Sequence, residues 1–170
     1  MSSEHTSVTG KEHPLTHQII ISSAILFLLF WILDSFIFNL STGLNIFIPL
    51  IFRITVFCVF LGLAIIVGVS SHNALFRENP DSSSLIKTEI YARVRHPLYL
   101  SMLLAYLALA LLTLSIISFA IWILIFILFN KMATYEEKDL ENIFGNEYTQ
   151  YRKRVPKWIP KLVLSKEFNK

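Results

Sequence analysis

Two polar groups, far apart in the sequence, carry side chains that could do chemistry. The first surrounds His96, which is preceded by Arg93 and Arg95 and followed by Pro97. Proline suits the first turn of a helix, where its missing N–H would be unpaired in any case. A helix that begins there would place unpaired N–H groups and a positive helix end beside the histidine. This pattern predicts a site for a carboxylate or a phosphate, although arginines that only contact lipid phosphates would give the same pattern.

The second group is the acidic pair Glu136-Glu137. Glu136, Leu140 and Ile143 are spaced as one face of a helix. Adjacent carboxylates on an exposed helix are most often solvated surface. The pair gains a chemical role if the chain folds so that Glu136 meets His96 and Tyr99. The elements that could bring these three residues together must therefore be identified.

The composition indicates that these elements are membrane helices. Of the 170 residues, 54% are hydrophobic and 16% are charged, whereas an ordinary soluble domain has about 25% charged residues. Apolar stretches run over 19–38, 46–69 and 98–129. About 20 helical residues cross a bilayer, so the first two stretches predict spanning helices. The third is too long for one modestly tilted helix, and we expect it to break near Thr113-Leu114-Ser115 and form a hairpin.

Charge favours the hairpin. It would put the amino tail, the polar loop after Val69 and the segment after Asn130 on one face, together with every Lys and Arg except Arg53. The positive-inside rule makes that face cytoplasmic. We therefore predict an all-α integral membrane protein with four transmembrane helices in two hairpins and both termini in the cytoplasm.

The predicted fold divides the chain into five regions. They are a polar amino-terminal tail (1–18), a first transmembrane hairpin (19–69), a cytoplasmic loop (70–97), a second transmembrane hairpin with a helix extension (98–147) and a basic interfacial tail (148–170). The tail mixes aromatic and basic residues, which is typical of a segment in the lipid headgroup region, and no nucleic-acid partner is expected.

Two charges, Asp34 and Arg53, lie inside the first hairpin. Charges within a membrane are costly and need an explanation. We expect an ion pair between the first two helices, with a transport pathway as the alternative. The single cysteine, Cys58, permits no intrachain disulfide and no cysteine-based metal cluster, and no metal site is predicted.

Taken together, these features resemble the isoprenylcysteine carboxyl methyltransferase family, which is grouped with bacterial and phospholipid methyltransferases. The resemblance covers about 85–160. The matching residues are Arg95-His96-Pro97-Leu98-Tyr99, Glu136-Glu137, Leu140, Phe144-Gly145, Tyr148, Tyr151 and Arg154-Val155-Pro156.

The resemblance implies a membrane enzyme that transfers a methyl group from S-adenosylmethionine (SAM). Its acceptor would be lipophilic or small, a prenylcysteine-type carboxylate by resemblance, and would arrive from the lipid bilayer. The resemblance assigns no catalytic residue. The residues that it implies in cofactor binding are Ser84, Leu85, Ile86, Tyr91, His96, Pro97, Leu98, Tyr99 and Glu136.

The chain departs from the family pattern at three positions. Glu89 and Ser101 stand where many members have glycine. Met132 stands where prenylcysteine methyltransferases carry an arginine that contacts the substrate, and the adjacent Lys131 lies about 100° round the helix. The acceptor therefore stays open, with a thiol or a phospholipid amine in place of the carboxylate. Two functions of a different class also stay open, an NADPH-dependent membrane reductase and a non-catalytic membrane subunit.

Overall fold

The computed structural model describes residues 16–77, 85, 87 and 89–160. Its long helices are α1 (Thr16–Ile32), α2 (Leu50–Arg77), α3 (Pro97–Thr113) and α4 (Ile116–Phe144), and they are followed by the short α5 (Asn146–Arg154). Three single-turn elements connect them: a π-helix at Leu33–Phe38 and 3-10 turns at Gly43–Ile46 and Glu89–Ala92. The described residues contain no strand, as the predicted all-helical class requires.

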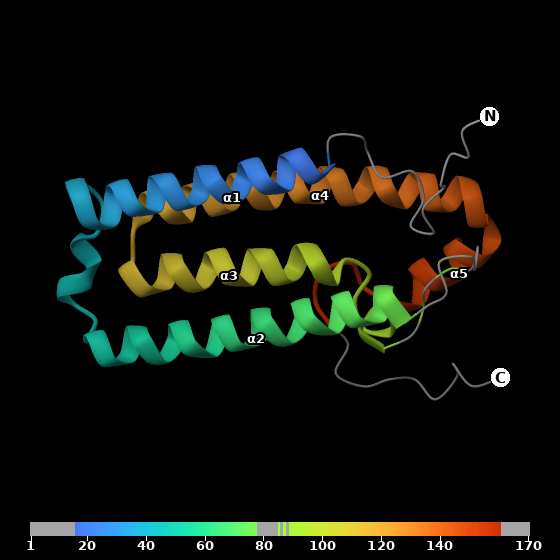
Figure 1. Cartoon of the computed structure of the whole chain (residues 1–170), viewed down its shortest axis with the longest axis horizontal. Helices are drawn as coiled ribbons and strands as arrows, with labels where there is room; N and C mark the ends of the chain where they lie inside the picture. Colours follow the sequence, from blue (N-terminus) through green and yellow to red (C-terminus); the bar gives the residue numbers. More distant parts are fainter. Residues whose placement is uncertain (1–15, 78–84, 86, 88, 161–170) are drawn as a thin grey trace.

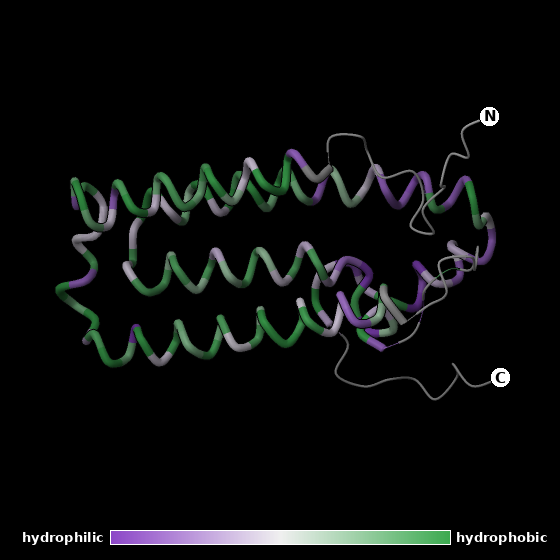
Figure 2. Tube along the Cα trace, in the orientation of Figure 1, coloured by the Kyte–Doolittle hydropathy of each residue, from purple (hydrophilic) through white to green (hydrophobic). Residues whose placement is uncertain are grey.

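The long helices form an elongated bundle (Figure 1). Helix α2 packs along α3, and α1 packs along α4, while α3 joins the two pairs. Colouring by hydropathy shows long apolar runs on these helices, with polar residues gathered toward the end that carries α5 (Figure 2). The bundle therefore has one polar end beside an apolar body.

Three segments are long and apolar enough to cross a membrane: Gln18–Phe38, Leu50–Leu75 and Ile116–Phe144. Helix α3 is also apolar but has only 17 residues. At 1.5 Å per residue it is about 26 Å long, a little less than a bilayer core of about 30 Å. Three candidate spans are thus present, and the fourth stays a prediction.

The predicted break in the third apolar stretch is present. Helix α3 ends at Thr113 and α4 begins at Ile116. Between them Leu114 adopts a left-handed backbone with φ of 49°, and the Ser115 side chain accepts the N–H of Ser118 at 3.0 Å. A serine cap explains how a hairpin forms without glycine or proline.

The loop predicted to begin at Ser70 begins later. Helix α2 continues through Ser70 to Arg77, so the boundary predicted at Val69 is eight residues too early. The prediction placed the boundary where the apolar run ends, but a helix can continue into polar sequence. Ser71 and Ala74 are buried on the extension 70–77, so packing stabilises this part of α2.

The prediction that Asp34 and Arg53 form an ion pair is wrong. Asp34 is buried and accepts hydrogen bonds from the Ser41 N–H at 3.0 Å and from the hydroxyls of Ser41 and Ser115. Arg53 donates to the Asn45 side chain at 2.6 Å and to a carbonyl at the end of α3 at 2.9 Å. Hydroxyls and a backbone N–H surround the Asp34 carboxylate, and two oxygens accept from Nη1 of Arg53. The aspartate therefore ties the first hairpin to the α3–α4 turn.

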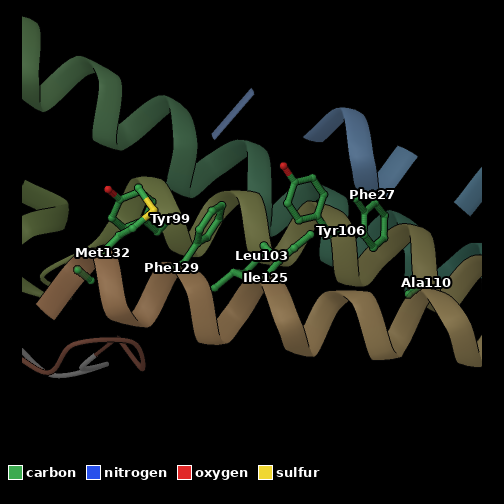
Figure 3. Close-up of a cluster of buried hydrophobic side chains, with 9 residues drawn as sticks. Phe27, Tyr99, Leu103, Tyr106, Ala110, Ile125, Phe129 and Met132 are labelled. Atoms are coloured by element: carbon green, nitrogen blue, oxygen red, sulfur yellow. The ribbon is translucent and has the colours of Figure 1, made fainter. Parts of the chain in front are cut away.

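An aromatic and aliphatic core runs between α1, α3 and α4 (Figure 3). Phe27 of α1 stacks on Tyr106 of α3, with ring centroids 4.7 Å apart. Nearer the polar end, the ring centroids of Tyr99 on α3 and Phe129 on α4 are 5.2 Å apart. The other buried members are Leu103, Ala110, Ile125, Met132 and Ala133. This core fixes the first turn of α3 against the middle of α4.

Candidate functional site

The site begins where α3 begins. His96 is the residue before the helix, and Pro97 occupies its first turn and is buried. The His96 side chain makes no capping hydrogen bond to its own helix. The residue is 8% exposed, and its ring lies beside α4. A proline at this position fixes the start of the helix and so fixes the place of the histidine.

The acidic pair of α4 contacts both ring nitrogens of His96. Nε2 lies 3.0 Å from Oε1 of Glu137, and Nδ1 lies 3.6 Å from Oε2 of Glu136. The Tyr99 hydroxyl, one turn into α3, donates to Oε1 of Glu136. The fold therefore brings together His96, Tyr99 and Glu136, which the sequence separates by up to 40 positions.

Glu137 is the member of this group that sequence reasoning missed as a site residue. It is 4% exposed, and Nη2 of the largely buried Arg95 lies 3.3 Å from its carboxylate. The buried series Ile125, Phe129 and Ala133 reaches it in steps of four residues. This series places Glu137 rather than Glu136 on the inward face of the helix. It is visible only in the packed structure, because nearly all residues from 116 to 129 are apolar.

The two carboxylates thus differ in surroundings. The Glu136 side chain is 19% exposed and contacts Tyr99 and His96, whereas Glu137 is enclosed by His96 and Arg95. A buried carboxylate beside two basic groups is suited to holding those groups in place. A carboxylate with one face toward solvent is suited to binding a ligand.

Residues 155–160, which we call the return segment, fold back from α5 onto the site. The Pro156 carbonyl accepts the Arg95 N–H at 3.0 Å. Lys157 donates to the Asn130 carbonyl at 3.1 Å and to the Thr134 hydroxyl at 2.7 Å. The Trp158 indole N–H donates to the Asn130 side chain at 3.0 Å. Part of the predicted interfacial tail is therefore attached to α3 and α4.

The Trp158 ring forms one wall of the site. Its centroid lies 6.1 Å from the His96 ring and 5.4 Å from the Phe126 ring on α4. The Tyr99 ring also lies beside the histidine, with ring centroids 5.9 Å apart. The histidine is thus bordered by aromatic rings from the return segment and from its own helix.

Helix α5 braces the loop before the site. The Tyr151 hydroxyl donates to the Tyr91 carbonyl at 2.8 Å, and the Tyr91 hydroxyl lies 3.1 Å from Oγ of Ser71 on α2. Burial raises the pKa of the Tyr91 phenol, and the nearby charge of Glu136 adds to that rise although the Ser71 hydrogen bond opposes it. Lys87 pairs with Glu147 at the start of α5. These contacts link α2, the loop and α5.

The other residues implied in cofactor binding have different surroundings. Tyr91 lies with Ser71 and Tyr151, and Leu85 packs against the buried side chains of α5. Leu98 is 43% exposed on the first turn of α3. Ser84 and Ile86 lie outside the described residues.

The residues that depart from the family pattern differ in backbone conformation and burial. Glu89 adopts φ of 52°, the left-handed region in which glycine is favoured. Ser101 lies against Gly68 of α2, where an added Cβ would come within 3.3 Å of its hydroxyl. Lys131 is exposed on α4 and Met132 is buried in the core. Lys131 is therefore not a positional replacement for the family's arginine.

Part of the chain is similar to known methyltransferases. Residues 70–147 match the model of the family described as phospholipid methyltransferase. The chain is 37% identical over 90 residues to methanethiol S-methyltransferase of Pseudomonas deceptionensis, covering 53% of this chain and 34% of that protein. It is 36% identical over 91 residues to protein-S-isoprenylcysteine O-methyltransferase of Schizosaccharomyces pombe, covering 53% of this chain and 38% of that protein.

A third relative, methanethiol S-methyltransferase 1 of Bradyrhizobium diazoefficiens, is 42% identical over 71 residues, which are 42% of this chain and 24% of that protein. The chain spans only about a third of the length of these relatives. The matched family segment, residues 70–147, contains His96, Tyr99 and the acidic pair. The resemblance predicted from the sequence is thus confirmed, and the part of the chain that carries the site is similar to the phospholipid and isoprenylcysteine methyltransferases.

Proposed function

We propose that this protein is an integral-membrane methyltransferase that uses SAM to methylate a lipophilic or small acceptor. One observation carries the proposal: His96 has a carboxylate beside each ring nitrogen, at the polar end of an apolar bundle. The same residues fall in the segment that matches a methyltransferase family.

The polar groups at the site fit the chemistry of SAM. Its methionine part carries an ammonium and a carboxylate, and its sulfonium is a cation. The partly exposed Glu136 and the Tyr99 hydroxyl are suited to an ammonium or to ribose hydroxyls. The positive start of α3 suits the carboxylate. When bound, SAM supplies an electrophilic methyl group, and the residues contribute chiefly by positioning it and excluding water.

We propose four membrane spans, with the site at the cytoplasmic boundary. Helix α3 is about 26 Å long, so its two ends lie near the two surfaces of a bilayer core of about 30 Å. His96 is at one end and the Asp34 cluster at the other. The basic residues of the loop, α4 and α5 share the His96 end, which favours its cytoplasmic placement.

A thiol is the acceptor chemistry that the residues favour. Two of the relatives are named for methylation of methanethiol. In addition, α4 presents the buried apolar Met132 where prenylcysteine methyltransferases carry arginine, and Lys131 is exposed beside it. A thiol would lose its proton to water at the interface. Its sulfur would form a bond to the methyl carbon as the methyl–sulfonium bond breaks, with that electron pair staying on the departing sulfur.

The test is calorimetric titration of the detergent-solubilised protein with SAM and with NADPH. We expect SAM to bind, and we expect His96→Ala and Glu136→Ala to weaken that binding at least about tenfold, the equivalent of one lost charge-assisted hydrogen bond. Glu141→Ala removes a carboxylate from the same helix, more than one turn away, and should leave the affinity unchanged. Binding of NADPH in place of SAM would support a reductase, and binding of neither would support a non-catalytic subunit.

A further inference from the structure

Trp158 occupies the boundary between the polar site and the apolar surface of α4. Its indole N–H is fixed by Asn130, and its ring contacts Phe126, which lies one turn further from the acidic pair. The centroid of the same ring lies 6.1 Å from that of the His96 ring. The indole is therefore close both to the polar site and to the apolar sequence that precedes Glu136 and Glu137 on α4.

The indole is held firmly at this boundary. The Pro156 carbonyl bonds to the Arg95 N–H on one side of it in the chain, and Lys157 makes two hydrogen bonds to α4 immediately before it. Trp158 is half-buried and packs against the core residues of the bundle. Four hydrogen bonds over residues 156–158 hold this part of the return segment, so the ring is fixed in place.

A lipophilic acceptor that approached His96 along α4 from the bilayer would pass this ring. Tyr99 stacks on the histidine with ring centroids 5.9 Å apart, and the Phe129 ring lies 5.2 Å from that of Tyr99. The imidazole therefore has two aromatic rings beside it, those of Trp158 and Tyr99. A rigid ring excludes a broad substituent much more strongly than it excludes a slender one.

We propose that Trp158 is a specificity-determining residue that limits the acceptor to small, slender molecules such as short-chain thiols. The inference rests on the proposed function, because it names the substrate class of the same site. The inference attributes the limit on acceptor size to one side chain of the return segment.

The test compares methyl transfer from labelled SAM to ethanethiol and to 1-adamantanethiol, with the full-length protein in lipid nanodiscs. We expect the wild type to favour ethanethiol in kcat/KM. Trp158→Ala should reduce this preference at least about tenfold, mainly through faster transfer to the bulky thiol. Asn130→Leu, which removes the hydrogen-bond acceptor of the indole, should shift the preference in the same direction by less.

Trp122→Ala is the matched control. Trp122 is also half-buried, packs against the same core and donates its indole N–H to a backbone carbonyl, that of Leu103, at 2.8 Å. Its loss should lower stability without changing the ratio between the two thiols. An unchanged ratio in Trp158→Ala would mean that Trp158 only packs, and would overturn the inference.

A second readout needs no turnover. Adamantyl methyl sulfide, an inert thioether, should bind Trp158→Ala at least about tenfold more tightly than the wild type in calorimetric titration. If the wild type transfers methyl to neither thiol, the proposed thiol chemistry is wrong. The thioether titration then decides the role of Trp158 by itself, since equal affinity for the two proteins would contradict it.

Discussion

The two adjacent carboxylates at the site have different surroundings. We therefore expect one of them to affect SAM binding and the other to affect the stability of the fold. The sequence pattern named the pair and predicted that Glu136 would meet His96 and Tyr99, and the fold brings these side chains together. It did not identify Glu137, because adjacent residues on a helix differ by about 100° and either could face inward. The choice depends on how α4 is rotated, which long-range packing of Phe129 and Ala133 decides.

Replacing each carboxylate by leucine should therefore have opposite main effects. Glu137→Leu leaves Arg95 buried without its acidic partner and removes one of the two carboxylates beside His96. We expect a loss of about 3 kcal/mol in stability. Glu136→Leu should cost much less stability, because this side chain is partly exposed, but should abolish SAM binding. Unfolding in detergent and SAM titration measure the two effects. Equal losses of stability in the two variants would contradict the assignment.

At the scale of elements, the hairpin was predictable and the packing of α5 was not. The length of the apolar stretch and the charge distribution together predicted a break near Thr113, and the break lies there. Helix α5 has a polar sequence with basic residues in its last turn, which suggested a surface segment. Its Tyr148 and Tyr151 are nevertheless buried, because they pack with Val155 and against Leu85, which is distant from α5 in the sequence.

The buried tyrosines of α5 should make the protein sensitive to alkaline pH. Burial raises the pKa of the Tyr148 and Tyr151 phenols far above the usual value, with Glu137 adding to the rise at Tyr148. A raised pKa in the folded state stabilises the fold below the unfolded pKa of about 10, and this stabilisation is lost as pH rises through the folded pKa. Stability should therefore fall above about pH 10.

Tyr148→Phe should weaken this alkaline loss. The Tyr148 hydroxyl is buried and has no hydrogen-bond partner among the described residues, so its removal at pH 7 should change stability by less than about 1 kcal/mol. Thermal unfolding of both proteins in detergent between pH 7 and pH 11.5 measures the difference. Parallel curves across the whole range would show that ionisation of Tyr148 is not coupled to folding.

At the scale of the whole molecule, two polar clusters lie at opposite ends of α3. One contains His96 and the acidic pair, and the other contains Asp34, Ser41 and Ser115 at the α3–α4 turn. The sequence indicated that Asp34 needed a partner inside the membrane but suggested the wrong one. An opposite charge was the simplest partner, whereas the hydroxyls became available only through the turn that the chain makes at Ser41 and Ser115. In both clusters, side chains distant in the sequence meet because α4 returns along α3.

The proposed topology predicts which residues share a side of the membrane. With Cys58 replaced by serine, single cysteines at Glu89, Asn146 and Gly43 provide exposed reporters just before α3, at the start of α5 and between the first two helices. A membrane-impermeant maleimide should label the first two only after the cells are permeabilised, because the proposed topology places the site end in the cytoplasm. It should label Gly43→Cys in intact cells. If Glu89→Cys and Asn146→Cys reacted from opposite sides, α3 and α4 could not form a transmembrane hairpin, and His96 could not meet Glu136 at one water–lipid boundary.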